Sequence, residues 1–90
     1  MKVKVEEIKK IDKENTRLKG MVKLSIDDQF IVNDIRIIEG NRGLSIAMPA
    51  VKMFDGKYKD IFHPINSDVE KEMSEIIIKK YNEFLEKEEV

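Results

Sequence analysis

Hydrophobic and polar positions alternate along much of the first two thirds of the chain. The clearest run lies between residues 18 and 26, where every second position is apolar or small: Leu18, Gly20, Val22, Leu24 and Ile26. A period of two predicts a β-strand with one buried and one solvated face. Residues 30–38 are rich in Ile, Val and Phe and predict the next strand, and the polar residues 27–29 between the two predict a hairpin turn.

Further strands are predicted on both sides of this hairpin. Val3, Val5 and Ile8 indicate a first strand whose alternation is broken once. Residues 44–48 alternate after a Gly-bearing turn at 39–43, and Pro49 ends the run. Asp55-Gly56 is a strong hairpin turn between two short arms, residues 51–54 and 58–62. We therefore expect four to six strands, mostly antiparallel because the connections are too short for crossovers.

The period changes from two to 3.6 in the last third of the chain. One helical face carries the apolar residues Val69, Met73, Ile76, Ile77, Tyr81, Phe84 and Leu85. Ile78 lies beside this stripe and either widens the buried face or contacts a partner. Ser67 stands three residues before Glu70, the spacing of a capping box, which predicts Ser67 as the N-cap. The patterns predict one α+β domain over residues 1–90, with strands over about 2–63 and a C-terminal α-helix over about 68–87 packed on an antiparallel β-sheet.

Composition excludes several kinds of site. The chain has no Cys and one His, so it offers no disulfide, thiolate nucleophile, zinc knuckle or multi-His metal site, and we expect no metal or cofactor. It shows no signal peptide and no run of about 18 apolar residues, which predicts a cytoplasmic protein without a membrane span. A domain of this size buries only roughly 60–65% of its unfolded surface, so self-association is a reasonable expectation.

Charge is unevenly distributed, although the formal net charge is only −1. Residues 1–19 hold seven basic and four acidic side chains, whereas residues 67–90 hold four basic and eight acidic ones. The common explanation of such a distribution is a set of solvated faces. It also leaves room for a basic surface that attracts phosphate, because the acidic charge is concentrated in the predicted helix.

Four basic residues are candidates for contact with nucleic acid. Lys52, Lys57 and Lys59 surround the Asp55-Gly56 turn, with two aromatic residues between them. Basic side chains alternating with aromatic ones can bind backbone phosphates and stack bases, although a solvated hairpin is the commoner explanation of so short a pattern. Arg42 lies at the tip of the preceding Gly-bearing turn, from which it could also reach a phosphate.

Other polar residues have structural explanations. Asp34 and Arg36 are two apart on one predicted strand, which indicates an ion pair or, alternatively, a polar cluster at an interface. His63, next to Pro64, has no second imidazole or thiol to share a metal, so we expect it to cap or to hydrogen-bond a turn. No Ser lies in a nucleophile elbow and no nucleophile–base pair is evident, so no catalytic residue is predicted and an enzyme is not expected.

Residues 30–67 closely resemble the SpoVG family, named for stage V sporulation protein G. The matches lie at the family spacing without gaps: Phe30, Val32, Asp34-Ile35-Arg36, Gly40-Asn41, Gly43-Leu44, Ala47-Met48-Pro49, Asp55-Gly56, Asp60-Ile61 and His63-Pro64-Ile65-Asn66. The resemblance implies a bacterial, non-enzymatic regulator of septation, sporulation and gene expression. It further implies a homodimer joined through sheet strands that binds DNA, and in some members RNA, with no small-molecule substrate.

The chain departs from the family pattern where the family carries basic residues. Val51 replaces one such residue after the Met-Pro step, and Glu70 and Glu72 stand where basic residues are frequent near the helix start. We expect weaker binding or a surface shifted to the four candidates above, with help from Lys9, Lys10, Lys19 or Lys23. The alternative is a protein-interaction module in septation control that does not touch nucleic acid, with an acidic surface that includes Glu83, Glu86, Glu88 and Glu89.

Overall fold

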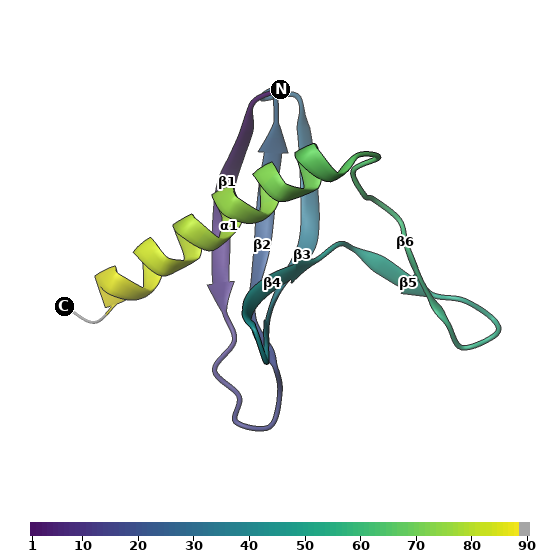
Figure 1. Cartoon of the computed structure of the whole chain (residues 1–90), viewed down its shortest axis with the longest axis horizontal. Helices are drawn as coiled ribbons and strands as arrows, with labels where there is room; N and C mark the ends of the chain where they lie inside the picture. The colour runs from purple at the N-terminus through teal and green to yellow at the C-terminus, as the bar shows by residue number, and fades with distance from the viewer. Residues whose placement is uncertain (89–90) are drawn as a thin grey trace.

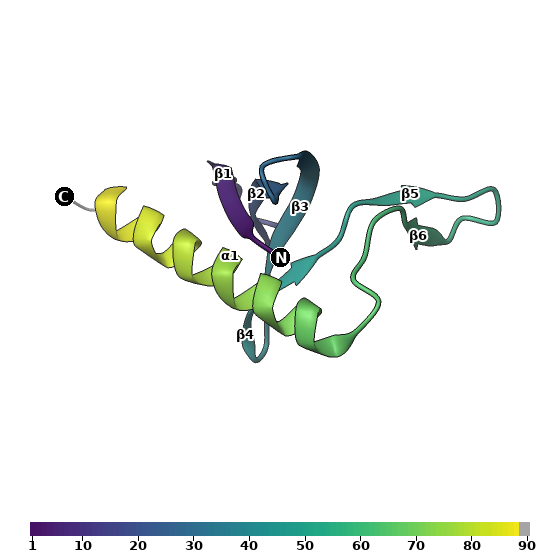
Figure 2. The same cartoon turned by 90° about the horizontal axis from the view of Figure 1, so that it is seen from above.

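The main body of the molecule is a four-stranded antiparallel sheet covered on one face by a helix. The structure, a computed structural model, describes residues 1–88. The strands follow one another across the sheet in the order β1-β2-β3-β4. Their bounds are β1 Val3–Lys10, β2 Leu18–Ile26, β3 Phe30–Gly40 and β4 Gly43–Ala47, and the helix α1 spans Ser67–Glu88. The predicted α+β class, with a C-terminal helix on an antiparallel sheet, is confirmed (Figures 1 and 2).

Two further strands form a separate hairpin that leaves the body. β5 (Ala50–Lys52) and β6 (Tyr58–Asp60) pair only with each other, in a two-stranded sheet. We call residues 50–61 the arm. It extends away from both the four-stranded sheet and α1 (Figures 1 and 2). The number of strands agrees with the prediction, but they are divided between two sheets because Pro49 ends the run that began in β4.

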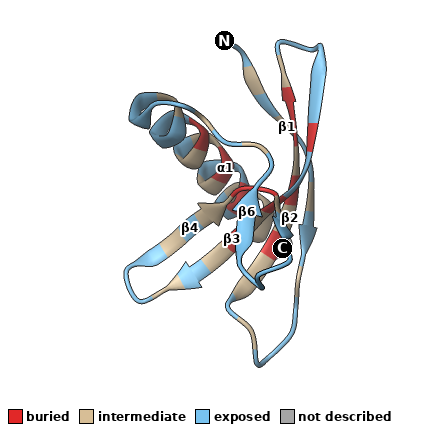
Figure 3. Ribbon diagram, turned by 90° about the vertical axis from the view of Figure 1, so that its right-hand side faces the viewer, coloured by how far each residue is buried: buried red, intermediate tan, exposed pale blue. Residues whose placement is uncertain are grey.

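The hydrophobic core lies between the sheet and α1 (Figure 3). Leu24, Ile35 and Ile37 of the sheet are fully buried against Met73 and Ile77 of the helix. The 3.6-residue stripe is therefore confirmed, with Val69 and Leu85 packed at the margins of the core and Ile78 half-buried beside it. Within residues 1–88 no helix is both long and apolar enough to cross a bilayer.

A β-bulge in β3 changes which residues share a face. Asp34 has a φ of 64°, and the register with β2 shifts between the pairs Leu24–Val32 and Val22–Ile35. The extra residue lets Val32 and Ile35 both point into the core although they are three apart. The expected Asp34–Arg36 ion pair is not formed within residues 1–88, and the Arg36 Nη2 instead donates to the Met48 carbonyl oxygen at 3.2 Å.

The N-cap of α1 lies one residue earlier than the sequence predicts. The Val69 N–H donates to Asn66 Oδ1 at 2.8 Å, and the Glu70 N–H donates to the Asn66 carbonyl oxygen at 3.3 Å. Asn66 is therefore the cap, and the prediction of Ser67 was wrong. Asn and Ser are about equally good N-caps, so residue preference alone did not separate two adjacent candidates.

Candidate nucleic-acid interface

The arm displays its three lysines on different sides. Lys52 pairs with Tyr58 across the hairpin, and Val51 pairs with Lys59. Because cross-strand partners share a face and successive residues alternate, Lys52 and Lys59 lie on opposite faces of the arm. Lys57 follows the Asp55-Gly56 turn, where its N–H donates to Asp55 Oδ1 at 2.9 Å.

The arm lysines carry positive charges that are not neutralised by the chain itself. Lys52, Lys57 and Lys59 are exposed, and within residues 1–88 none of them forms a salt bridge. On the body, by contrast, two of the lysines expected to assist are paired, Lys19 with Glu39 at 3.9 Å and Lys23 with Glu7 at 3.6 Å. An unpaired cation can contact a phosphate without first losing a carboxylate partner, so the arm is the better site for an anionic ligand.

Arg42 does not join the arm lysines. It lies in the turn that connects Gly40 of β3 with Gly43 of β4, and the Gly43 φ of 111° belongs to that turn. From there β4 runs along the sheet before the chain enters the arm, so Arg42 and the arm occupy different ends of an extended segment (Figure 1). The structure therefore places three of the four basic candidates on one element, the arm.

Large apolar side chains are exposed along the same arm, and most of them were missed in the sequence. Phe54 at the tip is fully exposed, and Tyr58 is 72% exposed. Val51, Met53 and Ile61 are exposed as well. Alternating apolar residues normally indicate a face buried on a second layer, and here the expected layer is absent from the described chain. The only feature of the sequence that could have indicated these exposed side chains is the excess of apolar residues on so short a hairpin.

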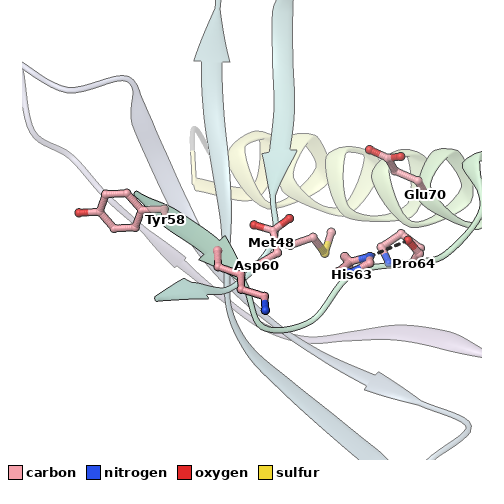
Figure 4. Close-up of a pocket in the computed structure, with 7 residues that line it drawn as sticks. Met48, Tyr58, Asp60, His63, Pro64 and Glu70 are labelled. Atoms are coloured by element: carbon pink, nitrogen blue, oxygen red, sulfur yellow. Dashed lines mark hydrogen bonds between the residues drawn. The ribbon is translucent and has the colours of Figure 1, made fainter. Parts of the chain in front are cut away.

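A cavity of about 500 Å³ lies between the arm and the start of α1. Its lining includes Met48, Tyr58, Asp60, His63, Pro64 and Glu70 (Figure 4). The His63 Nδ1 lies 3.0 Å from the Pro64 carbonyl oxygen, so the imidazole takes part in a turn (Figure 4). Within residues 1–88 no three His, Asp or Glu side chains form a group that could hold a metal ion.

The two glutamates that stand where the family pattern often has basic residues lie at or near this cavity. Glu70 lines it, and Glu72 is exposed nearby on the first turns of α1. The carboxylates of Asp60 and Glu70 share the lining with Lys59, so the cavity carries charges of both signs.

The fold and this site define a small α+β protein with a protruding, basic and apolar hairpin. The SpoVG family model matches residues 1–83 of the chain. A Staphylococcus carnosus protein named "Putative septation protein SpoVG" is 45% identical over 83 residues, which cover 92% of this chain and 77% of the relative. A protein of the same name from Agathobacter rectalis is 47% identical over 79 residues, covering 88% and 90%. A third, from Acholeplasma laidlawii, is 49% identical over 74 residues, covering 82% and 79%.

The chain therefore belongs to the SpoVG family. The resemblance drawn from the sequence is confirmed, and the family model covers residues 1–83.

Proposed function

We propose that this protein is a cytoplasmic, non-enzymatic regulator of septation and gene expression that binds DNA or RNA as a homodimer. The septation role is supported by the family and by the names of the relatives. The single observation that carries nucleic-acid binding is the arm, with three exposed lysines that form no salt bridge within residues 1–88. Dimerisation is supported by the thin core of so small a domain and by the exposed apolar side chains of the arm.

The energy of binding would come from the phosphate backbone. Each phosphate that a lysine neutralises releases condensed counterions, and for B-DNA each contact adds about −0.9 to the slope of log K against log salt. Two arms with three lysines each would give a slope of up to about −5. Base stacking on Tyr58 would add affinity with little sequence preference.

Fluorescence anisotropy at low salt, with labelled duplex and single-stranded oligonucleotides, tests this proposal. Lys52→Glu should weaken binding at least about tenfold and uniformly across sequences, because it removes a phosphate contact and adds repulsion. Lys71→Glu is the matched control, since Lys71 is exposed on α1 and the substitution changes the net charge equally. The absence of any anisotropy change with every oligonucleotide at low salt would refute nucleic-acid binding for this chain.

A second candidate function is a protein-interaction module that acts in septation control without nucleic acid. It is favoured by the acidic surface near the arm, to which Asp60, Glu70 and Glu72 contribute. Glu83 and Glu86 of α1 extend the acidic character, whereas Glu89 lies outside the described residues. Affinity capture with and without nuclease separates the two functions. A protein partner retained after nuclease treatment supports this module, and loss of every partner argues against it.

A further inference from the structure

We propose that a groove at the base of the arm is a binding site for the guanine base of a nucleotide. The site rests on the proposed function, under which this nucleotide belongs to a single strand of DNA or RNA, and it names the residues that select the base. The groove has a volume of about 290 Å³ and lies between the sheet and the arm. Cavities of about 150 Å³ already hold a benzene molecule, so a fused purine ring has room here.

The floor of the groove is the face of the sheet that α1 does not cover. Met21 of β2 and Arg36 of β3 are cross-strand partners and both line the groove. Their neighbours Val22 and Ile35 are buried in the core under α1, and successive residues of a strand point to opposite faces. Pro49 adds an apolar wall where the chain enters the arm.

An unusual backbone conformation places Asp34 at this groove. Its φ of 64° lies in the left-handed region, and the residue belongs to the β-bulge of β3. Bulges redirect side chains next to functional sites, and left-handed non-glycine residues gather where ligands are held. Asp34 lines the groove and is exposed. Within residues 1–88 no hydrogen bond or salt bridge engages its carboxylate, so both oxygens can accept from a ligand.

Arg36 supplies donors in the same groove. Its Nη2 donates to the Met48 carbonyl oxygen at 3.2 Å, which holds the guanidinium in place, and further N–H groups remain for a ligand. Within residues 1–88 Asp34 and Arg36 form no salt bridge with each other although both line the groove. A ligand that donates to the carboxylate and accepts from the guanidinium therefore fits their chemistry.

Guanine is the base whose edge matches this pair. It presents two neighbouring donors, N1–H and the N2 amino group, followed by the acceptor O6. The two oxygens of Asp34 can accept from both donors, and arginine is the common partner of O6. Adenine and cytosine each place an acceptor beside their amino group, and thymine and uracil place one donor between two acceptors. These four bases would leave one oxygen of Asp34 facing an acceptor.

The arm supplies the other two contacts that a nucleotide needs. Tyr58 lines the groove and is 72% exposed, so its ring offers a face on which a base can stack. Lys52 is the cross-strand partner of Tyr58, is exposed and forms no salt bridge within residues 1–88. Cross-strand partners lie about 5 Å apart, so Lys52 can hold the phosphate next to the stacked base.

Fluorescence anisotropy with short oligothymidylates that carry one different base at the centre tests the selection. Guanine, hypoxanthine and adenine are compared at this position. Hypoxanthine differs from guanine only by the missing N2 amino group, so its oligonucleotide should bind at least about fivefold more weakly. Adenine also replaces the acceptor O6 by a donor that faces Arg36, and it should bind more weakly still.

Asp34→Asn tests the residue that selects the base. Asn adopts the left-handed conformation as readily as Asp, so the bulge should be kept, and circular dichroism should match the wild type. An amide has one acceptor oxygen in place of two, so the preference for guanine over hypoxanthine should be lost. Asp28→Asn is the matched control, because Asp28 has a φ of 56°, lies in the turn between β2 and β3, and changes the charge equally. It should keep the preference.

Titration with free guanosine monophosphate, followed by the amide signals of residues 34, 36 and 58, separates the base site from strand binding. These signals should shift, and Asp34→Asn should weaken the binding at least about fivefold.

The outcomes distinguish this site from the proposed function. Oligonucleotides that bind without preferring guanine, or a guanine preference that survives Asp34→Asn, overturn the base site and leave nucleic-acid binding intact. If no oligonucleotide binds, nucleic-acid binding is refuted. Guanosine monophosphate that binds and is weakened by Asp34→Asn then still supports the groove as a nucleotide site, and its failure to bind overturns the base site as well.

Discussion

The body and the arm use the same apolar residue types to opposite effect. Ile77 of α1 is 0% exposed, whereas Ile61 of the arm is 64% exposed. The body has two layers, so each apolar face meets another, but the arm is a single hairpin with no second layer in the described chain. An exposed apolar face on a folded protein usually marks an interaction surface, so this difference separates the packed part of the molecule from the part that we propose to bind.

The boundary between the two regions is sharp. Met48 is buried in the core, and its carbonyl oxygen accepts a hydrogen bond from Arg36 at 3.2 Å. Pro49 follows, and its carbonyl oxygen accepts from the Ile61 N–H at 2.8 Å, which closes the base of the arm. The chain therefore leaves the body directly after a residue that is held by both packing and a hydrogen bond.

The largest expected effect compares the stability of the packed body with that of the exposed segment that joins the arm to α1. Ile77→Ala should lower the free energy of unfolding by about 2–5 kcal/mol, because it leaves a cavity in a fully buried site. Ile65→Ala removes the same atoms from an exposed site and should change it by less than about 0.5 kcal/mol. Urea denaturation measures both. Equal losses would show that the region around the arm is as well packed as the body.

The next largest expected effect compares how lysines of the arm and lysines of α1 contribute to nucleic-acid binding. Lys52→Gln/Lys57→Gln/Lys59→Gln should weaken nucleic-acid binding at least about 100-fold at low salt and flatten the salt dependence, because all the arm's phosphate contacts are lost. A matched triple on α1, Lys71→Gln/Lys79→Gln/Lys80→Gln, changes the net charge equally and should leave the slope unchanged. Anisotropy titrations at several salt concentrations decide between them, and equal weakening would indicate a general charge effect.

A smaller effect concerns the junction at which the chain returns from the arm to the body. Asn66→Ala should lower the free energy of unfolding by about 1 kcal/mol, because the Val69 N–H loses its capping acceptor. Ser67→Ala should cost less than about 0.5 kcal/mol, since Ser67 is the first helical residue and is exposed. Urea denaturation of both variants distinguishes the two caps. A larger loss for Ser67→Ala would contradict the assignment.

The smallest effect tests whether Arg42 acts with the arm. Arg42→Gln should change nucleic-acid affinity by less than about threefold at 0.1 M salt, where charges interact over about 10 Å, because its turn lies away from the arm. Lys52→Gln should weaken binding more in the same anisotropy titration. If both substitutions weakened binding equally, the β3–β4 turn would belong to the same interface.

Regular periodicity was a reliable guide to the elements of the body. β2 and α1 were predicted because their inward positions repeat at two or at 3.6 residues, and Leu24 and Ile77 are buried as expected. β3 was predicted from its content of Ile, Val and Phe. The broken alternation predicted for β1 coincides with a register shift between Val5 and Glu7, whereas the irregularity in β3 was not predicted. The bulge at Asp34 adds one residue and alters which side chains share a face, so the spacing of Asp34 and Arg36 wrongly indicated an ion pair.

The candidate site was predicted in part. Proximity along the chain around one hairpin turn correctly grouped Lys52, Lys57 and Lys59 on one element. Arg42 was grouped with them by charge alone, and its turn proved to lie elsewhere (Figure 1). Most of the exposed apolar side chains of the arm were missed because residue type indicates a tendency to be buried and not the presence of a covering layer.

The sequence by itself determined the family, the fold class, the helix with its buried stripe and the turn that presents the arm lysines. Each of these depends on local spacing or on residue identity, which are written directly in the chain. Only the tertiary structure decided that β5 and β6 leave the sheet, that the arm lysines form no salt bridge within residues 1–88 while Lys19 and Lys23 do, and that Phe54 is fully exposed. Burial and charge pairing depend on which segments meet in space. The helix α1 packs on the four-stranded sheet and not on the arm, so the same residue types are buried or paired in the body and exposed in the arm.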